Sequence, residues 1–197
     1  MLFNPPISGK TAITSTKPIA VQNMLGSSSN SSSAESLQWI LPLNGQPASM
    51  MLADPRLKDN LRSLLPHAHL SWDRHPLFEV VPALIRVDTT PIKIQDDRYV
   101  TVSGSSPALW TSRSILWFDL NEKKPLCIFV YIQNITTDSK NTDSSVHLDV
   151  YTTLNASEPL PGALLAEIAA YIRSLGSNVT TQGNIHFAGG SDRPLRW

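Results

Sequence analysis

The chain has 197 residues and a formal net charge of zero, because 16 Lys and Arg residues balance 16 Asp and Glu residues. This balance excludes the strongly basic surface that is typical of nucleic-acid binding proteins, so we do not expect nucleic acid as a partner. Charged residues make up 16% of the sequence, well below the usual fraction of about 25%. Ser, Thr, Asn and Pro take their place, and this composition favours strands and close-packed surfaces.

The first 34 residues differ from the rest of the chain. They contain no acidic residue, carry only Lys10 and Lys17 as charged side chains, and include a serine-rich run over residues 26–33. Such a segment cannot bury enough apolar surface to offset the entropy lost on ordering. We therefore expect residues 1–34 to form a flexible, disordered arm and residues 35–197 to form a single globular domain.

The N-terminal region lacks the long apolar run of a signal peptide or a transmembrane span. The single cysteine, Cys127, lies in an apolar run over residues 126–130. We expect it to be a buried, inert thiol without an intrachain disulfide. These features predict a cytoplasmic protein, located in the host cytoplasm or the virion if the protein is viral.

Two helices are predicted after the arm. The first begins at Asp54, a favourable N-cap, with Pro55 at the first helical position, and ends before Pro66. Its leucines recur at helical spacing on one face: Leu57, Leu61, Leu64 and Leu65. The second helix spans about residues 161–175 and is closed by Gly176.

Strand-like segments outnumber the helices and follow one another in hairpin-like groups. They cover residues 77–87, 92–95, 99–103, 114–120, 126–133 and 146–151, and a last hairpin over 178–181 and 185–187 turns at Gln182 and Gly183. Consecutive strands of this kind favour antiparallel pairing. The sequence therefore predicts an α+β fold, a β-rich antiparallel sheet or sandwich with two packed helices.

Three histidines near one aspartate suggest a metal site at first sight. His67, His69 and His75 lie within nine residues, close to Asp73. A zinc site needs three or four convergent ligands held by a second shell. Prolines bracket this segment and no cysteine accompanies it, so we interpret it as a polar loop and expect neither a metal nor another cofactor.

Two further motifs carry an incomplete signal. Residues 9–11 (Gly-Lys-Thr) are similar to the end of a phosphate-binding loop but lack its earlier glycine. His69-Leu70-Ser71 matches half of the motif of two-histidine phosphoesterases, in which one histidine acts as a base and the other as an acid. The other candidate histidines, His147 and His186, are not followed by the required hydroxyl residue. We therefore predict no catalytic residue.

The C-terminus is the predicted partner-binding site. Arg193, Arg196 and Trp197 belong to residue types that are enriched at interface hot spots. Trp197 ends the chain, so either it folds back onto the core or it docks into a neighbouring molecule.

The absence of a recognisable active site favours a non-enzymatic assembly protein. The first hypothesis is a viral coat- or matrix-like structural protein that binds itself, another protein or a peripheral membrane surface through its sheet and chain ends. The second is a bacterial effector, because the Ser-rich N-terminal 34 residues resemble the export signals of type III secretion. The third is a two-histidine phosphoesterase-like enzyme.

Overall fold

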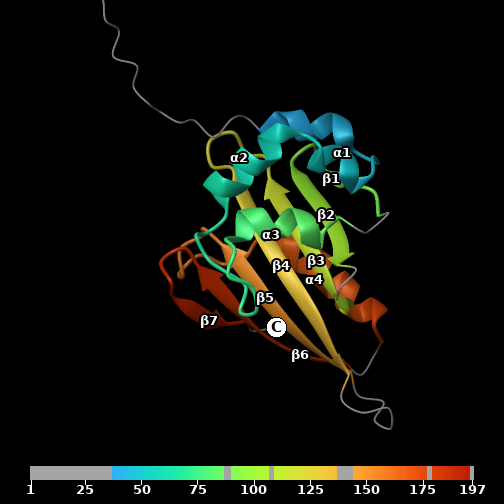
Figure 1. Ribbon diagram of the computed structural model, residues 1–197, viewed down its shortest axis with the longest axis vertical. Helices are drawn as coiled ribbons and strands as arrows, with labels where there is room; N and C mark the ends of the chain where they lie inside the picture. The colour runs from blue at the N-terminus through green and yellow to red at the C-terminus, as the bar shows by residue number, and fades with distance from the viewer. Residues whose placement is uncertain (1–36, 87–89, 107–108, 137–143, 177–178, 196–197) are drawn as a thin grey trace, which may run out of the picture. The chain divides into compact units, whose positions relative to one another are not determined.

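The computed structural model describes residues 37–86, 90–106, 109–136, 144–176 and 179–195 (Figure 1). The predicted arm lies outside these ranges, so its flexibility stays a prediction. The described part of the chain forms one seven-stranded sheet with helices on both faces. This arrangement confirms the predicted α+β class, as a single sheet rather than a sandwich.

The strands lie side by side in the order in which they occur in the chain. They are β1 (Lys93–Gln95), β2 (Tyr99–Ser106), β3 (Leu109–Asp119), β4 (Leu126–Thr136), β5 (Ser144–Thr152), β6 (Val179–Phe187) and β7 (Asp192–Pro194). Neighbours pair antiparallel except for β5 and β6, which are parallel. A parallel pair needs a crossover connection, and α4 (Gly162–Ser174) supplies it.

The two faces of the sheet are covered by different helices (Figure 1). One face packs Val100, Leu116, Phe118 and Phe129 against η1 (Leu37–Leu43), α1 (Ala48–Leu52), α2 (Pro55–Leu64) and α3 (Leu77–Leu84). The other face packs Trp117, Ile128, Val130 and Leu148 against α4 through Leu164 and Ile168. The alternation of side chains along each strand produces this division, and it means that the central strands are buried on both faces.

Both predicted helices are present, as α2 and α4. The Asp54 side chain accepts a hydrogen bond from the backbone N–H of Arg56 at 3.0 Å, so the cap forms as expected. Leu57, Leu61 and Leu64 are buried beneath α2. The helix ends at Leu64 because Leu65, the residue before Pro66, adopts an extended backbone.

Residues 77–87 were predicted as a strand, and this prediction is wrong because Leu77–Leu84 form α3. The buried residues of α3 recur at the helical positions i, i+3, i+4 and i+7: Leu77, Val80, Val81 and Leu84. Burial of this stripe against the sheet outweighs the strand preference of its valines. The short helices η1 and α1 were also missed, so α2 and α4 are two of five helices in the described residues.

The predicted hairpin at residues 178–187 is also wrong, because Val179–Phe187 form the single strand β6. Gly183 is not at a turn. It lies where β6 passes β5, and a Cβ atom at this position would collide with the backbone carbonyl of Leu148. The glycine is therefore required for close approach of two backbones, which is the other common reason for glycine in a strand.

Two further predictions concern the burial of Cys127 and the absence of a membrane-spanning segment. Cys127 is buried and unpaired, and burial raises the pKa of its thiol well above its ordinary value, as expected of an inert cysteine. In the part of the chain that the structure describes, every helix is too short or too polar to cross a membrane.

Candidate functional site

The predicted partner-binding residue Arg193 contacts other residues of the same chain. It lies on β7 opposite Ile185 of β6. Its Nη1 donates a hydrogen bond to the carbonyl oxygen of Ala156 at 2.6 Å, and its guanidinium lies 5.3 Å from the ring centre of Phe187. Arg193 therefore ties β7 to the loop that follows β5. Arg196 and Trp197 lie outside the described residues, and their partner contacts stay a prediction.

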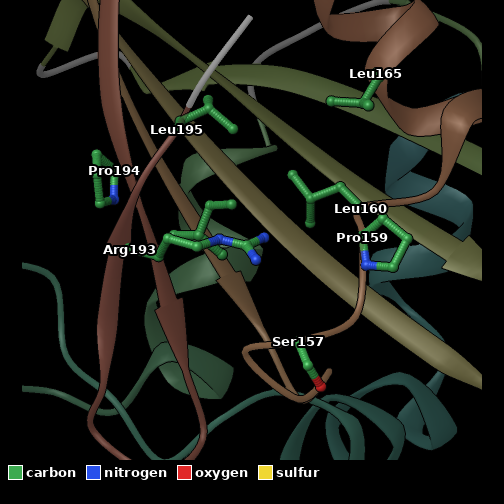
Figure 2. Close-up of a pocket in the computed structure, with 8 residues that line it drawn as sticks. Ser157, Pro159, Leu160, Leu165, Arg193, Pro194 and Leu195 are labelled. Carbon is green, nitrogen blue, oxygen red and sulfur yellow. The ribbon is translucent and has the colours of Figure 1, made fainter.

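A cavity of about 460 Å³ adjoins this arginine (Figure 2). Figure 2 shows the Arg193 side chain reaching from β7 toward Pro159 and Leu160. The remaining lining residues are mostly apolar: Leu165, Ile185, Pro194 and Leu195, with Ser157 at one end.

A second candidate site lies on the sheet face that carries α1 to α3. These helices contact β2, β3 and β4 (Figure 1). On the same sheet face, His147 and Asp149 of β5 are partly exposed together with His186 of β6, and Asp192 of β7 adjoins them. We call these four residues the histidine–aspartate cluster.

The cluster is built around one carboxylate and one imidazole. Oδ1 of Asp149 lies 3.0 Å from Nε2 of His186 and 3.3 Å from Nε2 of His147. Nδ1 of His186 lies 2.8 Å from Oδ1 of Asp192. When His186 is protonated, both of its N–H groups donate to carboxylates, so one side chain links three adjacent strands.

The charges in the cluster favour this protonated state. The hydrogen bond to Asp149 raises the pKa of His186; burial opposes this increase, and Asp192 reinforces it. Burial alone would raise the pKa of Asp149, but the hydrogen bond from His186 and the positive charges of His147 and His186 outweigh it and lower that pKa. The two carboxylates therefore favour the imidazolium form of His186.

Aromatic side chains surround the cluster. The Tyr151 ring stacks on His186 with a centroid distance of 4.6 Å, and Tyr131 lies directly opposite Asp149 across β4 and β5. Trp72, in the loop between α2 and α3, contacts Tyr131 with a distance of 5.8 Å between the two ring centroids. Trp72 is 49% exposed, one of two large hydrophobic residues in the described chain that are exposed to this extent; the other is Met50, at 54%.

The three loop histidines have separate surroundings. Nδ1 of His75 lies 2.8 Å from Oδ1 of Asp73, and His69 forms an isolated backbone bridge with Pro76. Across the described ranges, no group of three or more His, Cys, Asp or Glu side chains is placed to hold a metal ion. The Gly-Lys-Thr sequence at residues 9–11 lies outside those ranges.

The sequence pattern brought together only two of the four residues of the histidine–aspartate cluster. His147 and Asp149 lie two residues apart in the strand predicted over residues 146–151, and this spacing keeps their side chains on one face. His186 joins them only because β6 runs parallel to β5, which the predicted hairpin did not allow. No protein-family model matches the sequence, and no curated protein or solved structure gives a significant match.

Proposed function

We propose that this protein is a non-enzymatic assembly protein that binds further copies of itself through the surface formed by Trp72 and the histidine–aspartate cluster. The observation that carries the proposal is the half-exposed Trp72 ring, which lies in the loop between α2 and α3 and contacts Tyr131 of β4. Tryptophan and tyrosine supply a large share of binding energy at protein interfaces. The polar cluster beside them provides the hydrogen-bonding groups found around such aromatic anchors.

The state of the histidine–aspartate cluster supports binding over catalysis. A general acid or base must present its titrating atom to a substrate. Both ring nitrogens of His186 lie within hydrogen-bond distance of carboxylates instead, and Asp149 is shared between two histidines. A surface whose charges are already satisfied can be covered by a partner at a lower desolvation cost than one with unpaired charges.

A coat- or matrix-like role is the specific form of this proposal. The neutral charge and the flexible arm expected over residues 1–34 support it. In such assemblies an arm is ordered only when it binds a neighbour. The alternative of a type III-secreted effector rests on the composition of the same 34 residues, and a protein that remains monomeric would favour it.

Sedimentation velocity over a range of concentrations tests self-association. We expect concentration-dependent oligomers for the full chain, and at least a tenfold weaker association for Trp72→Ala. Met50→Ala is the matched control, because Met50 is equally exposed but lies on α1; it should leave association within about twofold of the original value. A full chain that stays monomeric, or equal effects of the two variants, contradicts the proposal.

One observation favours a second candidate, the two-histidine phosphoesterase. His147 and His186 lie on neighbouring strands and share the Asp149 carboxylate. Nδ1 of His147 has no hydrogen-bond partner among the described residues and could act on a substrate. If this candidate is correct, the protein hydrolyses a phosphodiester such as bis-p-nitrophenyl phosphate. The hydrolytic activity should be lost in His147→Ala and in His186→Ala, and it should be kept in His69→Ala.

A further inference from the structure

The net charge of the histidine–aspartate cluster changes with pH. Asp149 and Asp192 together carry two negative charges when both are ionised, and His147 and His186 together carry two positive charges when both are protonated. Histidine is the side chain whose charge ordinarily changes between about pH 5 and pH 8. With ionised aspartates, the cluster is neutral when both imidazoles are protonated and has a net charge of −2 when both are uncharged. It therefore becomes more negative as the pH rises through this range.

The phenol groups around His186 do not change their charge over the same range. Tyr151 stacks on the His186 ring with a centroid distance of 4.6 Å, and Tyr131 on β4 lies directly opposite Asp149. Burial raises the pKa of both phenols, so both stay neutral. Among the described residues of β4 to β7 around His186, the imidazoles are therefore the groups whose charge changes near neutral pH.

The loop between α2 and α3 carries charges of its own. Nδ1 of His75 lies 2.8 Å from Oδ1 of Asp73, and His67, His69 and Arg74 are exposed. In the described part of the chain, no hydrogen bond or ion pair joins these side chains to the histidine–aspartate cluster. The loop histidines therefore serve as comparison groups for the two histidines of the cluster.

The cluster lies beside the exposed aromatic ring on which the proposed function rests. The ring centroids of Trp72 and Tyr131 are 5.8 Å apart, and Tyr131 neighbours Asp149 across β4 and β5. The cluster side chains are themselves partly exposed, to 32% for His147, 17% for Asp149 and 24% for His186. A partner that covers Trp72 and the cluster removes water from these charged groups. Removing water from a charge costs free energy unless an opposite charge compensates it.

We propose that protonation of the histidine–aspartate cluster strengthens self-association, so that copies of this protein bind one another more tightly in mildly acidic than in mildly alkaline solution. This regulation rests on the proposed function, because it concerns the same surface. At high pH, association buries a negatively charged cluster on each copy, and contact between the same surfaces of two copies brings like charges together. Each proton that binds lowers both costs. Association therefore takes up protons and is favoured as the pH falls.

Sedimentation velocity of the full chain at pH 5.5, 7.0 and 8.5, at constant ionic strength, tests this regulation. We expect association to be roughly tenfold or more weaker at pH 8.5 than at pH 5.5. The double variant His147→Gln, His186→Gln has no titrating imidazole in the cluster, so its association should change by less than about twofold over this range. His67→Gln removes an exposed histidine of the loop instead, and should keep the full pH dependence.

Asp192→Asn separates an effect of interface charge from an effect of folding stability. Asp192 is 62% exposed, and the variant removes one negative charge from the cluster. It should therefore tighten association at pH 8.5 by roughly threefold or more. A pH effect that acts only through folding predicts weaker association instead, because the variant loses the ion pair between His186 and β7. Asp59→Asn is the matched control, since it makes the same charge change at a 77% exposed position of α2, and its association should stay within about twofold of the original value.

Thermal unfolding at each pH checks that every variant is folded. The regulation is overturned, while the assembly proposal stands, if association is independent of pH, tightens as the pH rises, or loses its pH dependence equally in His67→Gln. Weaker association of Asp192→Asn, or an equal gain in Asp59→Asn, overturns it as well. A full chain that stays monomeric at every pH overturns both proposals, so the two failures can be told apart.

Discussion

Nε2 of His186 on β6 lies 3.0 Å from Oδ1 of Asp149 on β5, and Nδ1 of the same ring lies 2.8 Å from Oδ1 of Asp192 on β7. A single imidazole therefore links the last three strands of the sheet. The edge strand β7 has only three residues and contributes few backbone hydrogen bonds. The ion pairs of His186 therefore add to the few backbone hydrogen bonds that hold β7 against the sheet. Their strength depends on pH.

The free energy of unfolding should fall as the pH rises through the neutral range. The pKa of His186 in the folded protein is raised above its ordinary value of 6.5. The stabilisation by protonated His186 is therefore complete below about pH 6.5 and is lost as pH rises through the higher folded-state pKa. Urea unfolding of the protein and of His186→Gln between pH 5.5 and 9 should show a difference that shrinks with pH.

The same cluster predicts a loss of stability in acid. The folded-state pKa of Asp149 is below its ordinary value of 3.8, so its contribution is present above that pH and is lost as pH falls through the lower value. Other titratable groups facing His186 are His147, Asp192 and Tyr151. A variant Asp149→Asn should remove most of both pH dependences, and unchanged pH profiles would mean that the cluster does not stabilise the fold.

Leu61→Ala should lower the free energy of unfolding by roughly 2–4 kcal/mol, because the truncated side chain leaves a cavity in the core. Leu61 is completely buried beneath α2. The control Lys58→Ala changes an exposed position of the same helix, where substitutions are usually within about 0.5 kcal/mol. Chemical denaturation of the two variants provides the comparison, and similar values would mean that α2 does not pack as described.

Gly183→Ala should destabilise the protein by about 1–3 kcal/mol or more, the usual cost of forcing an extra carbon into a packed site. A Cβ at Gly183 would collide with the backbone carbonyl of Leu148. Gly189→Ala is the matched control, because a Cβ there would meet no atom within 4 Å. Equal midpoints of the two variants in urea would show that β5 and β6 can separate without cost.

The sequence predicted the elements whose signals are local. The cap and leucine spacing of α2, the apolar run of β4 and the alternation in β5 all follow from neighbours in the chain. The segment 77–87 was misread because β-branched residues and a proline obscured the helical spacing of four buried side chains. Local preference was outweighed there by burial against the sheet.

The candidate sites depend on pairing between distant segments and so were mostly missed. Gly183 was interpreted as a turn, because a glycine required for close backbone approach has the same local appearance. Because a hairpin was predicted there, the sequence analysis did not include the parallel pairing of β5 and β6 that brings His186 to Asp149. Arg193 was predicted to bind a partner, which stays a prediction; its described contacts are to Ala156 and Phe187 of the same chain.

Two C-terminal truncations distinguish the core residue Leu195 from the two residues that follow it. Leu195 is buried, and its backbone N–H donates to the carbonyl of Gly183 at 2.8 Å. Ending the chain after Pro194 should therefore cost about 1.5–3 kcal/mol of stability, the value of burying a leucine side chain. Ending it after Leu195 removes only Arg196 and Trp197, and should leave the thermal midpoint nearly unchanged while weakening self-association in sedimentation velocity. If the chain that ends after Leu195 also loses many degrees in its thermal midpoint, Trp197 contributes to the core, and its predicted contact with a partner is wrong.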